Sequence, residues 1–221
     1  NVLDVTGIIK VQHSTFAGTY PSFETVTLNT DSTVDYALNG TQTIDNTFTY
    51  YNLTTSGGGT KTAGGAFSLA SNGTLTVSTG VFDPATYLIT GSGTNTLTVG
   101  SGGTLKVDNA TYALNYSEGF TTNTFNSAST IEYSRAGDQT IRGDITMGNL
   151  TISGTGTKSL SANSTALGTT TISGGILDVT GSNFTLDTGA IVISGGTANP
   201  SGFIERFREI LKKTDFPLPV R

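Results

Sequence analysis

Residues 32–62 read STVDYALNGTQTIDNTFTYYNLTTSGGGTKT, and residues 129–159 read STIEYSRAGDQTIRGDITMGNLTISGTGTKS. The two stretches align without a gap at an offset of 97 residues, and 16 of the 31 aligned pairs are identical. The correspondence continues upstream at an offset of 96, where residues 7–20 match residues 103–116 at several positions. A compact enzyme core is not divided in this way, whereas an array of stacked units is, because each unit contacts chiefly its neighbours.

A finer spacing lies within the repeat. Short alternating triplets begin at Val34, Leu53, Leu75 and Leu97, at intervals of 19, 22 and 22 residues. Apolar, polar, apolar triplets bounded by Gly, Asn and Ser indicate half-buried strands with turns between them. A period near 20 residues is typical of one coil of a parallel β-solenoid, so one copy is expected to hold about five coils, stacked ~4.8 Å apart.

The expected fold is therefore an all-β parallel β-solenoid, a right-handed β-helix of about ten coils and roughly 45 to 50 Å long. An antiparallel β-sandwich is the structural rival, since it also has short strands and frequent turns. The sandwich does not predict a repeat that keeps its register over 31 positions. Within the solenoid, Asn52 and Asn149 precede equivalent inward leucines, and their side chains are expected to hydrogen-bond to backbone in the same way.

Charge marks a boundary near residue 200. Residues 1–199 are predicted to form the solenoid, with copies at about 7–102 and 103–199, and residues 200–221 to form a separate tail. The net charge is −7 up to Gly202 and +2 from Phe203 onward. An acidic body without basic clusters cannot neutralise a phosphate backbone, so no nucleic-acid partner is expected. No apolar run is long enough to predict a transmembrane segment.

The tail has a helical pattern, with one apolar stripe and charged residues opposite it. The stripe consists of Phe203, Ile204, Phe207, Ile210 and Leu211. An amphipathic helix here is expected to cap the last coil, whose apolar cross-section and free backbone edge invite aggregation. Contact with a membrane surface or a partner, or an appended foreign segment, stays open. No comparable cover precedes the first coil, so head-to-tail self-association is also expected.

Few residues carry chemistry. The chain has no cysteine and one histidine, His13, which has no obvious partner and is interpreted as a turn residue. The nearest approach to a site is the loop stretch that contains Arg135, Asp138, Arg142 and Asp144. The first copy lacks both arginines, which permits either a specialised site or drift on a solvated loop. No metal, cofactor or catalytic residue is expected, and the Arg-Gly-Asp string at residues 142–144 is interpreted as incidental.

Threonines suggest a weaker hypothesis. Thr74 and Thr76 are expected to point outward and to stack under Thr96 and Thr98, at a spacing of 22 residues. Ladders of this kind are the surface of solenoid ice-binding proteins. This one is expected to be two coils long and interrupted by charge, so ice binding is only a weaker alternative.

The strings NLTISGTGTK at residues 149–158 and TTISGGILDV at residues 170–179 resemble the Thr/Gly-rich strand repeats of large bacterial surface proteins. The family meant is that of autotransporter passengers and haemagglutinin-like adhesins, and the resemblance covers residues 1 to about 199. It implies a secreted or cell-surface solenoid that acts as a stalk or adhesive surface, with itself or extracellular polymers as partners. The alternative is a β-helix that binds or cleaves polysaccharide, and cleavage would require convergent carboxylates in one groove.

Overall fold

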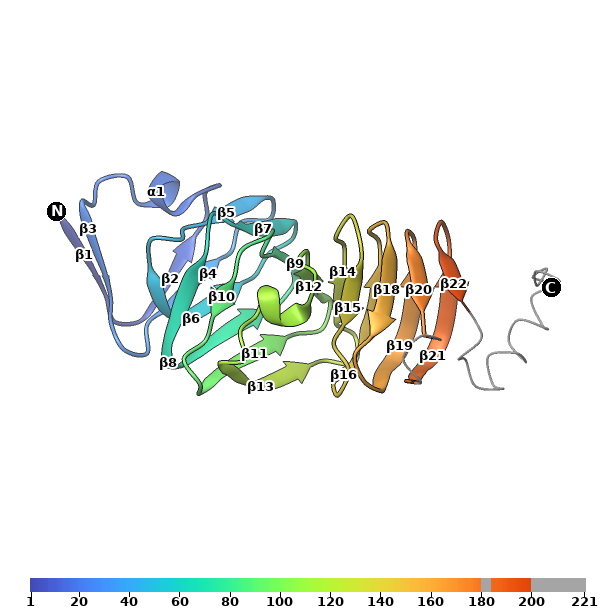
Figure 1. Ribbon diagram of the computed structural model, residues 1–221. Coiled ribbons are helices and arrows are strands. Elements are labelled where there is room, and N and C mark those ends of the chain that lie inside the picture. The colour runs from blue at the N-terminus through green and yellow to red at the C-terminus, as the bar shows by residue number, and fades with distance from the viewer. Residues whose placement is uncertain (180–183, 200–221) are drawn as a thin grey trace, which may run out of the picture.

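The computed structural model describes residues 1–179 and 184–199, and these form an elongated β-solenoid of about nine turns (Figure 1). The described chain advances from the N-terminus at one end of the rod to Asn199, in the last strand, at the other. Every strand pair in the described residues is parallel. The predicted solenoid is therefore confirmed over the antiparallel sandwich, with about nine turns where about ten were expected.

Three parallel sheets form the faces of the rod. The first has the order β13(Phe120–Phe125), β11(Asn95–Val99), β8(Phe67–Val77), β6(Thr49–Thr55), β4(Thr33–Tyr36), β2(Ile8–Val11), with β10(Ile89–Thr90) beside β8. The second has the order β16(Thr146–Met147), β19(Ser164–Ile172), β17(Asn149–Ile152), β14(Thr130–Tyr133), β12(Gly103–Val107), β9(Gly80–Asp83), β7(Thr60–Ala63), β5(Gln42–Ile44), with β21(Leu186–Ile193) beside β19. The third has the order β15(Gln139–Ile141), β18(Thr157–Leu160), β20(Ile176–Asp178), β22(Thr197–Asn199).

Smaller elements interrupt the coils. At the N-terminal end β1(Val2–Val5) pairs with β3(Thr25–Leu28) in a separate sheet. Two short helices occupy equivalent places in the two copies: α1(Phe16–Thr19) and the 3-10 turn η1(Tyr112–Leu114). Each lengthens its coil and places one aromatic ring, Phe16 or Tyr112, in the core.

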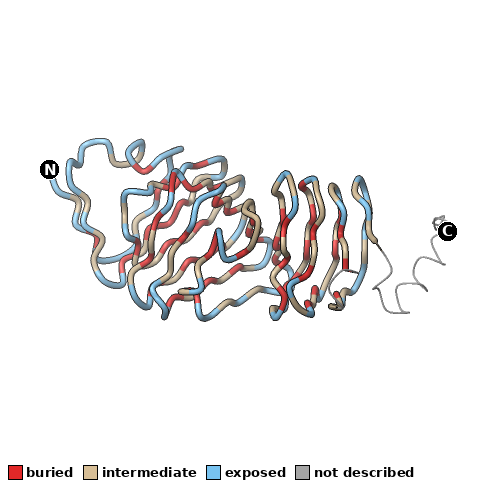
Figure 2. Tube along the Cα trace, in the orientation of Figure 1, coloured by how far each residue is buried: buried red, intermediate tan, exposed pale blue. Residues whose placement is uncertain are grey.

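Strict alternation along the strands builds the core. In β11 the side chains of Asn95, Leu97 and Val99 are buried, whereas Thr96 and Thr98 face outward. A strand alternates its side chains between two faces, so every coil sends one set inward to stack on the sets above and below. Buried segments accordingly recur in every coil between intermediate and exposed ones (Figure 2). The expected inward and outward assignment of the Leu-Thr-Val triplets is confirmed.

The two copies occupy different faces of the rod. In sequence β12 is the counterpart of β2, yet β12 pairs with β9 and β14 in the second sheet, while β2 lies in the first. Likewise β15 is the counterpart of β5 but lies in the third sheet rather than the second. One copy therefore spans four coils and one further face, not the five whole coils that the sequence predicted. Equivalent outward side chains consequently point in different directions around the rod.

Two buried lysines hold the coils together in the same way in both copies. Lys61 and Lys158 are each 0% exposed. The Lys61 ammonium donates to the carbonyls of Leu38, Gly40 and Gly58, each at 2.7 Å. Because burial removes water from the charged form, the pKa of each lysine is lowered.

In the second copy, the Lys158 ammonium donates to the carbonyls of Arg135 at 2.9 Å, Thr155 at 2.6 Å and Gly137. Both cages join a turn to the turn one coil earlier. Each ammonium thereby donates to three carbonyls of neighbouring turns. Some of these carbonyls also accept a backbone N–H, since Gly40 donates to Gly58 and Gly137 donates to Thr155.

Amides repeat this pattern. Gln42 donates to the carbonyls of Val11 and His13 at 2.8 and 2.7 Å, and Gln139 makes the equivalent bonds at the same two distances. Asn52 and Asn149 each accept a backbone N–H from the next coil, at 3.1 and 2.9 Å, and each donates to a carbonyl of the preceding coil. The prediction of one shared role for these two asparagines is confirmed.

Glycine is required where turns of neighbouring coils stack closely. Gly59 and Gly156 both have a φ of +75°, a conformation that a side chain disfavours. A Cβ at Gly59 would lie 2.6 Å from the carbonyl carbon of Gly40, and one at Gly156 would lie 2.4 Å from that of Gly137. The repeated Gly-x-Gly turns therefore allow the coils to approach each other.

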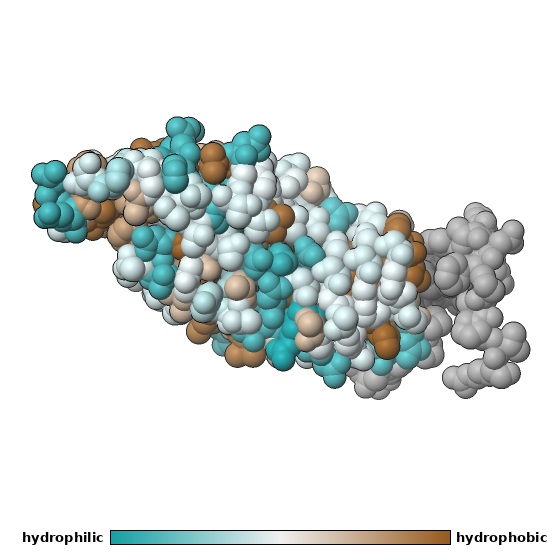
Figure 3. All heavy atoms as spheres, turned by 90° about the horizontal axis from the view of Figure 1, so that it is seen from above, coloured by the Kyte–Doolittle hydropathy of each residue, from teal (hydrophilic) through white to brown (hydrophobic). Residues whose placement is uncertain are grey.

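The face of the rod seen from above presents mostly residues of intermediate hydropathy, with scattered hydrophilic and apolar patches (Figure 3). This agrees with a composition of only 12% charged residues. No helix among the described residues is long and apolar enough to cross a membrane. The predicted capping residues Phe203, Ile204, Phe207, Ile210 and Leu211 lie outside the described residues.

Candidate functional site

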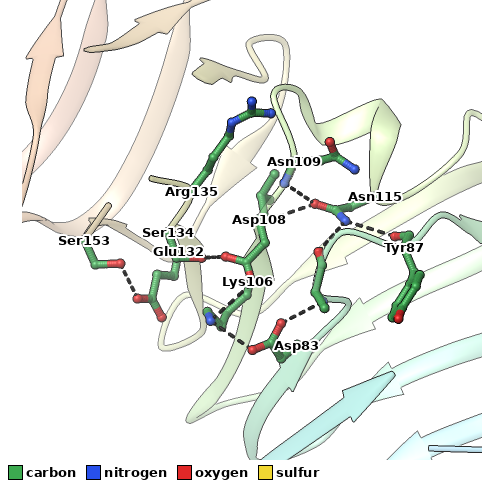
Figure 4. Close-up of polar contacts among 12 residues, drawn as sticks. Asp83, Tyr87, Lys106, Asp108, Asn109, Asn115, Glu132, Ser134, Arg135 and Ser153 are labelled. Atoms are coloured by element: carbon green, nitrogen blue, oxygen red, sulfur yellow. Dashed lines mark hydrogen bonds and ion pairs between the residues drawn. The ribbon is translucent and has the colours of Figure 1, made fainter. Parts of the chain in front are cut away.

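A cluster of charged side chains lies on the outer side of the second sheet (Figure 4). The Lys106 ammonium, on β12, lies 2.9 Å from Asp83 Oδ2 and 3.3 Å from Asp108 Oδ2. Asp83 ends the neighbouring strand β9 and also accepts the N–H of Ala85 at 2.8 Å. The Ser134 hydroxyl donates to Asp108. Lys106 thus joins two carboxyl groups that come from successive coils.

The two carboxyl groups differ in acidity. Burial raises the pKa of Asp108 to about 6, and the hydrogen bond and negative charge of Asp83 act in the same direction. Burial also opposes ionisation of Asp83, but hydrogen bonds from Asp108 and Lys106 outweigh it and lower the pKa of Asp83. Burial would lower the pKa of Lys106, yet both carboxylates together raise it. Around neutral pH the lysine is therefore charged, and the pair of carboxyls holds a proton in mildly acidic solution.

A second candidate lies in the second copy, where two hollows meet at one loop. Their volumes are about 580 and 510 Å³, and Arg142 and Asp144 line both. The larger hollow runs between the segment around η1 and the coil that contains β15. Hereafter the two hollows together are called the Arg142 groove.

The arginine of this groove is held on several sides. Its backbone N–H donates to the Tyr133 hydroxyl at 2.9 Å, and its Nε lies 3.3 Å from Asp144 Oδ1. Its guanidinium carbon lies 5.0 Å from the centre of the Tyr112 ring, a cation–π arrangement. The Arg142 side chain is still 34% exposed. It is therefore fixed in place and open to a ligand.

The structure divides the predicted loop site into two parts. Arg142 and Asp144 come together in the groove. Arg135 and Asp138 lie on the other side of β15, where they serve the backbone: Asp138 accepts the N–H of Thr157 at 2.8 Å, and the Arg135 carbonyl accepts from Lys158. The Arg135 guanidinium extends away from the carboxyl cluster in Figure 4.

The Arg-Gly-Asp string is part of this packed loop. A Cβ at Gly143 would lie 2.3 Å from the Ala162 side chain of the next coil. Asp144 has a φ of +62°, in the left-handed region, and its carboxylate pairs with Arg142 inside the same tripeptide. The two charged ends of the string thus contact each other, and its incidental nature stays a prediction.

The threonine ladder is longer than expected. Thr122 and Thr124 continue the columns of Thr96 and Thr98 on the first sheet, and these stand next to Thr74 and Thr76. Three successive coils therefore carry outward Thr-x-Thr pairs, not two. The sequence spacing missed the third pair because its coil includes η1 and is 26 residues long, counted from Thr98 to Thr124.

Sequence reasoning also missed the carboxyl cluster. Asp83 and Lys106 are 23 residues apart, which is close to the 22-residue spacing of the threonine ladder. Their contact across neighbouring coils could therefore have been predicted from this spacing. Asp108 directly follows β12 and is two residues from Lys106, so strand alternation could have placed its side chain on the same face. No group of three or more His, Cys, Asp or Glu side chains in the described part of the chain is arranged to hold a metal ion.

Comparison with known proteins adds no relative: no family model, no curated protein and no solved structure matches this chain.

Proposed function

We propose that this chain is a structural or adhesive segment of a secreted or cell-surface repeat protein, in which the rod acts as a spacer or holds a binding surface at a distance and performs no catalysis. The residues that the two copies share carry this proposal, because they join neighbouring coils and do not form a site. Their common residues include the lysine cages at Lys61 and Lys158 and the glutamine and asparagine anchors, all of which join coils.

The outward groups support the same proposal. Because the second copy is rotated by one face, shared outward residues do not converge on one site. Polar groups converge in the carboxyl cluster and in the Arg142 groove, and each of these occurs in one copy of the repeat. A rod with a repeated interior and locally distinct surface patches suits a spacer that presents contacts.

A glycan array combined with a polysaccharide-degradation assay tests this proposal. The purified chain is applied to immobilised glycans and, separately, incubated with soluble polysaccharides while new reducing ends and unsaturated ends are measured. Binding without product, or neither binding nor product, agrees with an adhesive or purely structural segment. Product formation that rises with protein concentration would overturn it.

The enzymatic alternative would use the carboxyl cluster, since Asp83, Asp108 and Lys106 converge. Three features weigh against it. Asp83 and Asp108 both pair with the Lys106 ammonium, at 2.9 and 3.3 Å, so one cation occupies both carboxyls and they do not flank a free space as glycosidase carboxyls do. Lys106 has a raised pKa and is a poor base. Neither hollow of the Arg142 groove includes these residues. If degradation were observed, its loss in Asp83→Asn would assign it to this cluster.

Ice binding is supported by the three-coil threonine ladder on the first sheet. Below it the columns continue with Asn52 and Thr54, then with Thr33 and Asp35, so a carboxylate interrupts the surface. Thermal hysteresis of the purified chain tests this alternative. Hysteresis that disappears in Thr98→Tyr, but persists in a Thr171→Tyr control on the second sheet, would favour ice binding over adhesion.

A further inference from the structure

The Arg142 groove has a counterpart in the first copy that is filled. There Phe48 packs against Phe16 with ring centres 4.9 Å apart, and its edge contacts Tyr50 at 5.9 Å. In the second copy the positions of Phe48 and Tyr50 are taken by Ile145 and Met147. One scaffold thus carries a packed aromatic column in one copy and an open groove in the other.

The residue over the buried ring changes accordingly. Phe16 is covered by a phenyl ring, whereas the equivalent Tyr112 is covered by the Arg142 guanidinium. One backbone contact is common to both copies, because the N–H of Asp45 and that of Arg142 each donate to an equivalent tyrosine hydroxyl, at 2.8 and 2.9 Å. Two residues further on the backbones differ, since Asp144 has a φ of +62° whereas its counterpart Thr47 has no positive φ. The second copy thus combines a different turn with an exposed polar group beside a hollow, where the first copy has apolar filling.

The groups that line the groove define the ligand chemistry. Arg142 supplies planar donors and Asp144 and Glu118 supply acceptors, while Thr111, Thr140 and Ser161 supply hydroxyls. Ala113 adds exposed apolar surface between them, and the buried Tyr112 and Tyr116 form the floor. A volume of about 580 Å³ falls in the range of ligand pockets, roughly 300 to 1,000 Å³.

We propose that the Arg142 groove binds a neutral oligosaccharide. Sugar hydroxyls both donate and accept, so they match a site that offers a guanidinium beside carboxylates, and the C–H faces of a sugar ring pack on apolar surface. An anionic ligand fits less well, because two carboxylates and one guanidinium leave the groove negative. This inference rests on the proposed adhesive function and gives that function its ligand class.

Binding is tested by calorimetric titration with neutral hexasaccharides of glucose, xylose, mannose and N-acetylglucosamine, and with hexagalacturonate as the anionic probe. At least one neutral probe is expected to bind. Arg142→Ala and Thr140→Ala are expected to weaken that binding at least tenfold. Thr43→Ala, at the equivalent position of the first copy, is the matched control and should leave the affinity unchanged.

The variant Ile145→Phe places the first copy's ring in the groove without removing a polar group. It should abolish binding while the melting temperature stays about the same, which separates a filled groove from a misfolded rod. Glycan binding that survives both Ile145→Phe and Arg142→Ala would overturn the groove and leave the adhesive function in place. Preference for hexagalacturonate would overturn the neutral ligand class. No binding of any probe, with all variants folded, would overturn the inference and leave a purely structural rod.

Discussion

The two copies of the repeat agree in their interior and differ in one groove. Lys61 and Lys158 hold equivalent turns with the same three kinds of bond, yet Phe48 fills a space in the first copy that Ile145 leaves open in the second. The shared part is buried and polar, and the differing part lies at the surface. Stacking of coils therefore constrains buried donors and acceptors most strongly, while the outer coil segments are free to acquire contacts.

The largest loss of stability is expected at Lys61 and Lys158, and it should be similar in the two copies if their contacts are equivalent. Lys61→Met and Lys158→Met each remove three hydrogen bonds from a charged group that join neighbouring turns, and we expect each to lower the free energy of unfolding by about 3 to 5 kcal/mol. Chemical denaturation followed by circular dichroism measures this loss. Lys10→Met, at an exposed lysine, is the control and should be nearly neutral. A large loss in one copy only would show that the copies are not held together alike.

The next largest loss of stability is expected at Gln42 and Gln139, whose side chains bond to the preceding coil. Gln42→Leu and Gln139→Leu keep the approximate volume but remove two donors and one acceptor, and each should cost about 2 to 3 kcal/mol. The same denaturation measurement applies, with exposed Gln12→Leu as its control. Losses below about 0.5 kcal/mol, the usual size of a surface effect, would mean that water replaces these bonds easily.

The filled and open grooves should respond differently. Phe48→Ile removes the ring that contacts Phe16, and it should destabilise the rod by about 1 to 2 kcal/mol. Ile145→Phe should be close to neutral, because Arg142 already covers Tyr112 and the added ring can enter the hollow that Ile145 lines. Equal destabilisation by both changes would contradict an open groove in the second copy.

The carboxyl cluster should produce the smallest effect, seen as a pH dependence. Asp108 has a pKa of about 6 in the folded chain against an ordinary value of 3.8, so the folded state holds its proton more tightly. The stabilisation is present below about pH 4 and is lost as the pH rises through about 6. Lowering of the Asp83 pKa acts in the opposite sense, and only below about pH 4.

Asp108→Asn fixes the protonated arrangement. The variant should be more stable than the natural chain at pH 7 by about 1 kcal/mol, a value reduced for partial exposure, and should lose the slope between pH 4 and pH 7. Thermal melting across this pH range measures both. An unchanged slope in the variant would assign the pH dependence to other groups.

The sequence alone predicted the strands, the inward leucines and the shared role of Asn52 and Asn149, because alternation and a gapless repeat are both visible in one dimension. It did not predict the rotation of the second copy, since the number of faces in a coil leaves no trace in the spacing. Lys61 and Lys158 occupy inward positions of β7 and β18, where a charged residue is not expected. Their partners are carbonyls of neighbouring turns, which no residue type reveals.

The candidate site was predicted only in part. Arg142 stands out in the sequence because the first copy lacks it, but the exchange of Phe48 for Ile145 has no visible meaning without the contact between Phe48 and Phe16. Asp138 looked like a site residue and is a turn acceptor, since its role depends on the coil above. Contacts across one coil join residues about 20 apart, and insertions such as η1 shift that distance.

Disulfide trapping tests the rotated stack most directly, and the chain offers a background without cysteine. Thr104 stands opposite Val81 across parallel strands, on adjacent coils of the second sheet. If β11 and β12 instead formed an antiparallel hairpin, Thr104 would stand opposite Thr98. Oxidation should therefore close a bond in the Val81→Cys/Thr104→Cys variant and leave Thr98→Cys/Thr104→Cys reduced, as shown by thiol titration and peptide mass. Closure in the second variant and free thiols in the first would contradict the rotated solenoid.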